Sequence, residues 1–231
     1  MNKIDFNKLD FDKEINFIHN LILPREEKEK GNVFLNFMNI SFTLKKELFR
    51  KTIHMLSSFV PFFYFFSPAL TMIFLLFVSF SYFMSEILRF KKIRIPLVTQ
   101  ITELASRSRD EGKVVLGPIT LSLGIFLALT FFDYRVAIIS VFALSFGDGV
   151  ASLFGKIIGG PKIPFTFGKT FAGSIGCFIV LIIVFFSCGL NFNQALFLAL
   201  FSSTVEAFPT GDFDNLIIPV ATGIVAQNFV I

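Results

Sequence analysis

Seven apolar runs follow one another after about residue 50, and each approaches the length that an α-helix needs to cross a bilayer. The chain has 231 residues, of which 54% are hydrophobic and 35 are phenylalanine, which is unlike an ordinary soluble domain. We therefore predict an all-α integral membrane protein with about seven transmembrane helices, at 45–67, 69–90, 114–132, 136–154, 171–189, 195–208 and 216–231.

Basic residues predict how these helices are oriented. With the N-terminus in the cytoplasm and seven alternating spans, 20 of the 21 lysines and arginines fall in the cytoplasmic segments 1–51, 89–113 and 154–170. Arg135 is the exception. The net charge of +4 is thus better explained by a membrane than by nucleic acid, so no nucleic-acid partner is expected. The prediction is a multi-pass protein of the cell membrane.

The first 46 residues differ from the rest in composition, because they carry seven of the 17 acids and no long apolar run. Phe11, Ile15, Ile18 and Ile22 recur at helical spacing, which predicts a short amphipathic helix in a cytoplasmic N-terminal extension (1–46). Residues 47–231 are predicted to form the membrane domain. No cleavable signal peptide is visible, and the two cysteines are too far apart in one helix to bridge each other.

The stretch from 145 to 174 interrupts an apolar region with seven glycines, three lysines and Asp148. A carboxylate at the end of a membrane helix is costly and usually has a task. Gly147 and Gly149 flank it, and they either admit a ligand or pack against another helix. The stretch predicts a phosphate and metal site at the membrane surface.

Lys169 and Thr170 precede an apolar helix, which puts a cation, a hydroxyl and free N–H groups at its N-terminus. The motif is not a P-loop, because the first glycine of that pattern is replaced by Ile163. Lys169 can still offer a point charge to a phosphate. The alternative is a lysine at the membrane surface beside a helix-capping threonine.

Two further polar clusters are expected on the cytoplasmic side. Residues 47, 50, 51 and 54 share one helix face, which is either a basic collar at the membrane or a polar stripe that faces a site. Near the C-terminus, Glu206 stands in an apolar run, and an acidic turn that includes Asp212, Asp214 and Asn215 follows it. Such oxygen ligands suit Mg²⁺. Residues 106–118 are predicted to bring a charged loop to the same face.

Taken together, these residues resemble the polyprenol kinase family, which contains dolichol kinase, phytol kinase and the yeast-type diacylglycerol kinase and is related to phosphatidate cytidylyltransferase. The resemblance covers about Glu47 to Ile218, roughly three-quarters of the chain. Five short blocks carry it, in this order: ELFRKTIH (47–54), DEGKVVLGP (110–118), GDG-x-A-x-x-x-G-K (147–156), P-FTFGKTFAGS (164–174) and VEA…FDN (205–215).

The resemblance implies a phosphotransferase that moves the γ-phosphate of CTP to the hydroxyl of a membrane lipid, with Mg²⁺ as cofactor. Asp148 and Asp214 are then the metal ligands, and Asp148, His54 and Glu206 are the catalytic candidates. Either Asp148 or His54 is the base for the lipid hydroxyl. The expected nucleotide and phosphate contacts are Arg50, Lys51, Gly147, Gly149, Lys156, Lys169, Thr170 and Asn215.

Two other functions were weighed against this one. A phosphatidate cytidylyltransferase is disfavoured because segment 202–215, SSTVEAFPTGDFDN, has no histidine and one glycine, where that family has a longer basic and glycine-rich pattern. A small transporter is disfavoured because ionisable residues gather at one face rather than through the membrane's depth. The lipid alcohol and the oligomeric state are left open.

Overall fold

The computed structural model describes residues 44–91, 93, 98, 102, 113–166 and 168–230. The chain divides into two units at Lys45 and Lys46, and the helices below belong to the second unit, apart from the first two residues of the first helix. The predicted amphipathic helix at 11–22 and the charged loop residues 106–112 lie outside the described part.

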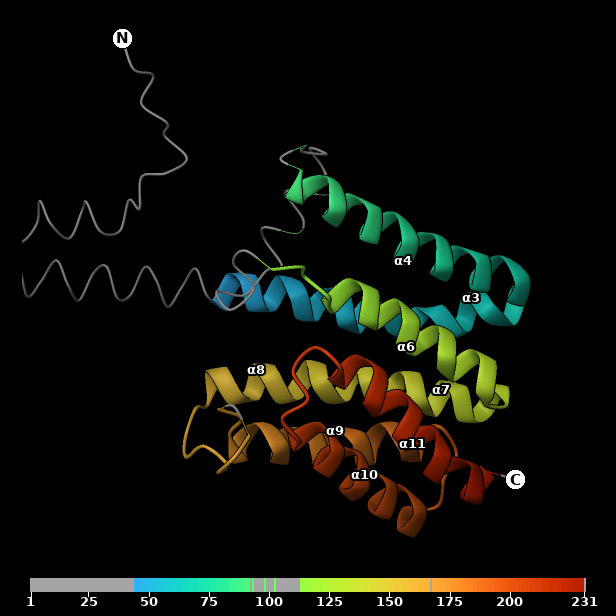
Figure 1. Cartoon of the computed structure of the whole chain (residues 1–231). Helices are drawn as coiled ribbons and strands as arrows, with labels where there is room; N and C mark the ends of the chain where they lie inside the picture. Colours follow the sequence, from blue (N-terminus) through green and yellow to red (C-terminus); the bar gives the residue numbers. More distant parts are fainter. Residues whose placement is uncertain are drawn as a thin grey trace, which may run out of the picture. The chain divides into compact units, whose positions relative to one another are not determined.

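Every regular element in the described part of the chain is helical, as the apolar runs predict (Figure 1). A helix at 44–56 continues through the 3-10 turn η1 (Ser57–Phe59) into α3 (Val60–Phe66). Ser67 leaves helical geometry, and Pro68 then opens α4 (Pro68–Phe90), because the residue before a proline disfavours the α conformation. The remaining helices are α6 (Gly117–Phe131), α7 (Tyr134–Phe142), α8 (Gly149–Ile157), α9 (Phe171–Ser187), α10 (Phe192–Ala207) and α11 (Asp214–Val230).

The segment that was predicted as the fourth span is one long helix with an irregular middle. α7 leads into η3 (Ala143–Asp148), a π-helical turn, and η3 leads into α8 without a break in helical dihedral angles. A π-turn inserts an extra residue into a helix and is common at functional sites. Asp148 is the last residue of this turn.

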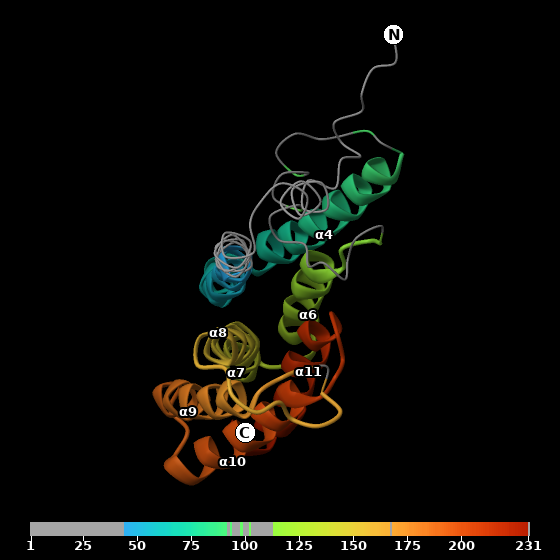
Figure 2. The same cartoon turned by 90° about the vertical axis from the view of Figure 1, so that its left-hand side faces the viewer.

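Helix contacts place the 134–157 helix at the centre of the described unit. α8 and η3 pack on α9, α9 packs on α10, and α11 packs on α6, α7 and α10, whereas α4 packs on α6 and α3. In Figure 2 these helices are seen from the end at which α8 finishes and α9 begins. The core is apolar and includes Ile125, Ile139, Leu181 and Leu198, none of which is more than 2% exposed.

Two described helices, α4 and the 134–157 helix, are long and apolar enough to cross a membrane. The apolar stretch of α4 is 28% buried against the rest of the protein, compared with 67% for the 134–157 helix. α6 and α9 are shorter apolar helices. The helical part of the prediction is therefore confirmed, while seven membrane crossings stay a prediction.

The close contact between α8 and α9 depends on Gly173. A Cβ atom at this position would lie 2.5 Å from the carbonyl oxygen of Ala151, so a larger residue would push the two helices apart.

Cys177 and Cys188 are both free thiols. This agrees with the prediction that they are too far apart along one helix to form a disulfide.

Candidate active site

A cleft opens where the 44–56 helix, the start of α6, the end of η3 and the start of α11 meet. Its lining combines charged and apolar residues, and it is formed by Arg50, Ile53, His54, Val115, Gly117, Pro118, Leu121, Asp148, Asp212, Asp214 and Asn215. Three of the predicted polar clusters thus converge on one cleft, although they are separated by up to 165 positions in the sequence.

Asp148 lies at the centre of this site and is 5% exposed. Its Oδ2 forms an ion pair with the ammonium group of Lys51, and the same oxygen lies 3.2 Å from Nδ1 of His54. His54 Nδ1 has no hydrogen bond, since the geometry of that contact is unsuitable for one. Both contacts use Oδ2, which leaves Oδ1 for a cation in the cleft.

A hydrogen bond between two serines holds the 44–59 segment against the π-turn. The hydroxyl of Ser57 lies 2.8 Å from that of Ser145, and Ser57 also donates to the carbonyl of His54. This contact sets His54, about one helical turn before Ser57, and Lys51, about two turns before it, opposite Asp148. The 47–54 residues therefore form an inward-facing stripe: Glu47, Lys51 and His54 are each less than 5% exposed, and the alternative of a membrane collar is wrong for them.

Glu47 joins the 44–56 helix to α8. Its carboxylate accepts hydrogen bonds from Arg50, from the hydroxyl of Ser152 and, at 2.6 Å, from Lys156. The Glu47 carboxylate holds Arg50 at the edge of the cleft, where the Nε of Arg50 is buried without a hydrogen-bond partner.

Lys169 reaches the end of α10 from the loop that joins α8 to α9. Its ammonium group lies 2.7 Å from the carboxylate of Glu206 and also donates to the Glu206 carbonyl. This ion pair brings together Lys169 and Glu206, two residues that the sequence analysis assigned to one site. The pair belongs to the same electrostatic cluster, because Lys169 also lowers the pKa of Asp214.

Asp214 and Asn215 begin α11 beside α6. The side-chain amide of Asn215 donates to the hydroxyl of Thr120 (2.9 Å) and to the carbonyl of Gly117 (3.2 Å), which ties the acidic turn to α6. Burial, and then the negative charge of Asp148, raise the pKa of Asp214 to about 7. The charge of Asp148 therefore opposes the ionisation of Asp214, and Lys51 and Lys169 offset this effect only in part.

The donor set fits Mg²⁺ in the way that nucleotide enzymes use it. In the described part of the chain, no three His, Cys, Asp or Glu side chains gather closely enough to enclose a metal ion by themselves. Mg²⁺, however, commonly takes one or two carboxylates and completes its shell with waters and substrate phosphates. Asp148 and Asp214 line one cleft and repel each other's charge, so they suit such a partial site.

Several predicted ligand residues lie elsewhere. Thr170 caps α9 by accepting a hydrogen bond from the Gly173 amide, which matches the alternative of a helix cap. A Cβ atom at Gly147 would meet Leu181 and Cys177, and one at Gly149 would meet Met55. These three residues are absent from the cleft lining. The two glycines serve helix packing here, and Lys156 is held by Glu47.

Glu86 is a buried acid that the sequence reasoning did not single out. It is 1% exposed, accepts two hydrogen bonds from Arg89 (2.8 and 2.7 Å) and accepts one from the Val115 amide (3.0 Å). Arg89 also donates to the Lys113 carbonyl. α4 thereby holds the segment that carries Val115 and Pro118 into the cleft. The sequence could have indicated a role for Glu86, because it is the one acid in the apolar run 69–90.

The chain is similar to plant proteins named as phytol kinases. It is 26% identical over 152 residues to probable phytol kinase 1, chloroplastic, of Oryza sativa subsp. japonica (58% of this chain, 48% of the relative). It is 25% identical over 142 residues to phytol kinase 1, chloroplastic, of Arabidopsis thaliana (54% and 47%), and 32% identical over 136 residues to probable phytol kinase 2, chloroplastic, of Glycine max (51% and 47%).

The chain spans about half the length of these curated relatives. It matches no family model and no solved structure. The similarity to several phytol kinases supports the resemblance to the polyprenol kinase family that the motifs indicated, and it supports a lipid-alcohol kinase at that level.

Proposed function

We propose that this protein is a CTP-dependent kinase of a membrane lipid alcohol. The observation that carries the proposal is a cleft lined by both charged and apolar residues. Its charged residues include Asp148, Asp214 and Arg50, and its apolar residues are Ile53, Val115, Pro118 and Leu121. A cleft of this kind suits a substrate with a reactive hydroxyl on a long hydrocarbon chain. The similarity to phytol kinases, which are named for such an alcohol, supports the same substrate class.

The charged residues of the cleft suit phosphoryl transfer, which depends mainly on positioning and charge neutralisation. Asp148, through Oδ1, and Asp214 would hold Mg²⁺, which when bound would neutralise charge on the transferring phosphate. Arg50 and Lys169 would contact the phosphates. Lys51 would keep Asp148 in place.

In the reaction, the lipid hydroxyl oxygen forms a new bond to the γ-phosphorus as the bond from that phosphorus to the bridging oxygen breaks, and CDP leaves. The hydroxyl proton passes to a base in the cleft. His54 and Asp148 remain the two candidates, and His54 Nδ1 lies 3.2 Å from Asp148 Oδ2. CTP as the donor rests on the resemblance to the family.

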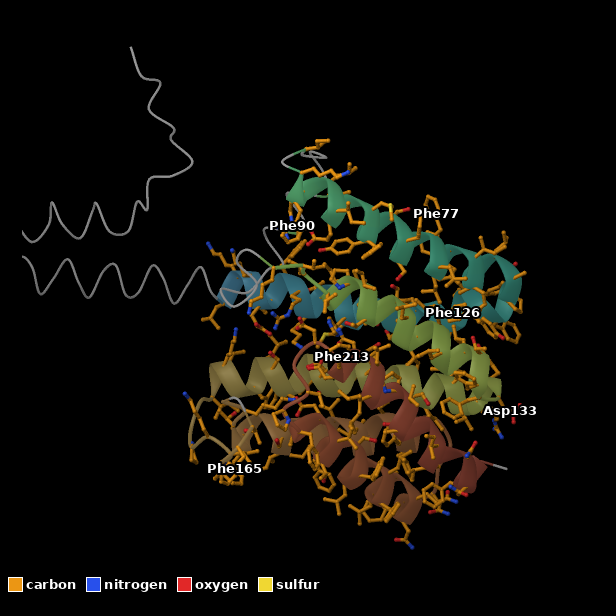
Figure 3. The ribbon with its side chains drawn as sticks, in the orientation of Figure 1. Phe77, Phe90, Phe126, Asp133, Phe165 and Phe213 are labelled. Carbon is orange, nitrogen blue, oxygen red and sulfur yellow. The ribbon has the colours of Figure 1, made fainter. Side chains whose placement is uncertain are left out.

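We further propose that the protein is a multi-pass protein of the cell membrane, with this cleft on the cytoplasmic side. The distribution of basic residues supports the orientation. In Figure 3, Asp133 and Phe165 mark opposite ends of the described unit, and Phe165 belongs to the end that carries the lysines of the α8–α9 loop.

The proposal is tested by incubating purified protein with Mg²⁺ and either CTP or ATP, together with phytol, a polyprenol or diacylglycerol. We expect one of these alcohols to be phosphorylated with release of CDP. Release of pyrophosphate and formation of a CDP-lipid from phosphatidate would identify a cytidylyltransferase instead. Absence of nucleotide turnover with all the alcohols and with phosphatidate would favour a protein that is not an enzyme, such as a transporter.

A further inference from the structure

The loop between α8 and α9 is an ordered hairpin, which we name the 158–170 hairpin. Lys162 and Thr170 form an antiparallel bridge. The Ile163 amide donates to the Lys169 carbonyl (2.8 Å), and the Phe171 amide donates to the Pro161 carbonyl (3.2 Å). The structure describes residues 158–166 and 168–170 of this hairpin.

Phe165, at the tip of the hairpin, combines two unfavourable features. Its side chain is 96% exposed, the highest value among the large apolar residues that are exposed in the described part of the chain. Its φ is +63°, in the left-handed region that residues with a bulky side chain rarely adopt. Backbone strain of this kind tends to persist at functional positions. Figure 3 shows Phe165 at the edge of the described unit, below the end of α8.

The apolar surface around Phe165 continues along α9. Phe171, Ile175, Ile179 and Ile183 recur every four residues, and each is 48–61% exposed, so they form one outward stripe on the helix. At the other limb of the hairpin, Ile157 and Ile158 are 70% and 63% exposed. Exposed apolar side chains thus lie on α9, at the end of α8 and at the tip of the hairpin that joins these two helices.

The charge of the hairpin shows what kind of surface it fits. Residues 158–170 include two lysines and no acid, and one of them, Lys169, is paired with Glu206. Lys162 is exposed beside the apolar tip. A positive charge next to exposed apolar side chains matches the anionic headgroup region of a bilayer, into which the apolar groups insert.

We propose that the 158–170 hairpin is an interfacial anchor that inserts Phe165 into the headgroup region of the cytoplasmic leaflet, where it continues the lipid-facing stripe of α9. This inference rests on the membrane placement proposed above. The returning limb of the same hairpin carries Lys169 to Glu206, and Lys169 also acts electrostatically on Asp214, so the hairpin connects the lipid surface to the charged groups of the candidate site. The hairpin would hold Lys169 at a fixed depth relative to the lipid that supplies the hydroxyl.

The chain contains no tryptophan, so a single introduced indole reports on its own position. The experiment compares Phe165→Trp with Ile179→Trp in full-length protein, reconstituted in vesicles of phosphatidylcholine and phosphatidylglycerol. Some of the lipids carry bromine either near the headgroup or near the end of the acyl chain. We expect the shallow bromine to quench Phe165→Trp more strongly than the deep one. The opposite order is expected for Ile179→Trp, in the middle of α9.

The inference is overturned if acrylamide quenches Phe165→Trp freely while neither bromine does and Ile179→Trp responds as expected. It is also overturned if the indole at 165 is shielded from acrylamide without any quenching by lipid, because a protein surface then covers it. Failure of both variants to respond to bromine would contradict the membrane placement itself. A nitroxide on Phe165→Cys, in a chain without the two native cysteines, gives a second depth reading by oxygen-accessibility EPR and follows the same criteria.

Discussion

At the scale of single residues, Asp148 interacts with a lysine, a histidine and a second acid of the candidate site. It pairs with Lys51, faces His54 and raises the pKa of Asp214. We predict that Asp148→Asn lowers kcat for lipid phosphorylation by about 10²- to 10³-fold, because an electrostatic group that acts on the reacting phosphate is lost. The measurement is transfer of label from CTP to the lipid.

The matched control for this substitution is Asp133→Asn. Asp133 is exposed in the turn before α7, at the other end of the described unit, and its side chain forms no capping hydrogen bond. The Asp133→Asn variant should retain full activity. Retention of activity by Asp148→Asn, in a protein that folds normally, would remove Asp148 from the catalytic machinery.

Lys169 allows a separate test of phosphate contact. We predict that Lys169→Met raises KM for the nucleotide by about tenfold to hundredfold, since hydrogen bonds to charged groups contribute about 1.5–3 kcal/mol. Lys169→Arg should restore part of the affinity. Lys162→Met, in the same hairpin but exposed, should leave the nucleotide KM unchanged. Equal effects at 162 and 169 would instead indicate a general effect of the loop's charge.

The candidate residues also show what sequence can and cannot predict about a site. Asp148, Lys51, His54, Lys169, Glu206 and Asp214 stood out because charged groups in or beside apolar helices are costly, and the structure brings them into one cluster. Gly147, Gly149 and Thr170 were assigned to the nucleotide as well. Their chemistry suits helix packing or capping equally, and only the neighbouring helices decide between these uses.

At the scale of elements, the π-helical turn η3 was beyond the reach of the sequence pattern. Apolar periodicity predicts a helix over 136–154 but does not distinguish regular from π-helical hydrogen bonding. The turn ends at Asp148, beside the contact between Ser57 and Ser145. Its position therefore follows from packing between distant segments, which a local pattern does not contain.

Glu86 supplies a prediction about α4. Glu86→Gln removes the ion pair to Arg89 and weakens the bond to the Val115 amide, so the apolar lining of the cleft loses its attachment to α4. We predict a loss of about 2 kcal/mol in the free energy of unfolding. KM for the lipid alcohol should rise several-fold, while KM for the nucleotide stays close to that of the wild type.

Ser85→Ala is the control for this prediction, because the Ser85 hydroxyl donates only to the Tyr82 carbonyl of its own helix. It should change neither KM. The two constants separate the possible roles of Glu86. A rise in the nucleotide KM equal to that of the alcohol would show that Glu86 maintains the whole site rather than its apolar lining.

At the scale of the whole molecule, the order and bounds of the helices were largely predictable. The apolar runs at 69–90 and 171–189 correspond to α4 and α9 within two residues at either end. The packing partners of each helix were not predictable, because apolar composition does not indicate which helices contact one another. α4 and the 134–157 helix have similar hydropathy, yet they differ more than twofold in buried share.

Membrane topology provides the last prediction, because it joins the charge pattern to the position of the site. The turn at Asp133 and the α9–α10 turn lie at one end of the helices, and the 158–170 hairpin lies at the other (Figure 1). If basic residues orient the chain as proposed, the hairpin end faces the cytoplasm.

In a chain whose two cysteines, Cys177 and Cys188, are replaced by alanine, single cysteines at Asp133, Lys113 and Lys162 then distinguish the two sides. We expect a membrane-impermeant maleimide to label Asp133→Cys in intact cells. Lys113→Cys and Lys162→Cys should be labelled only after the cells are opened. Labelling of Lys162→Cys from outside would place the cleft away from cytoplasmic nucleotides. The kinase proposal would then fail on topology alone, whatever the chemistry of Asp148 and Lys169.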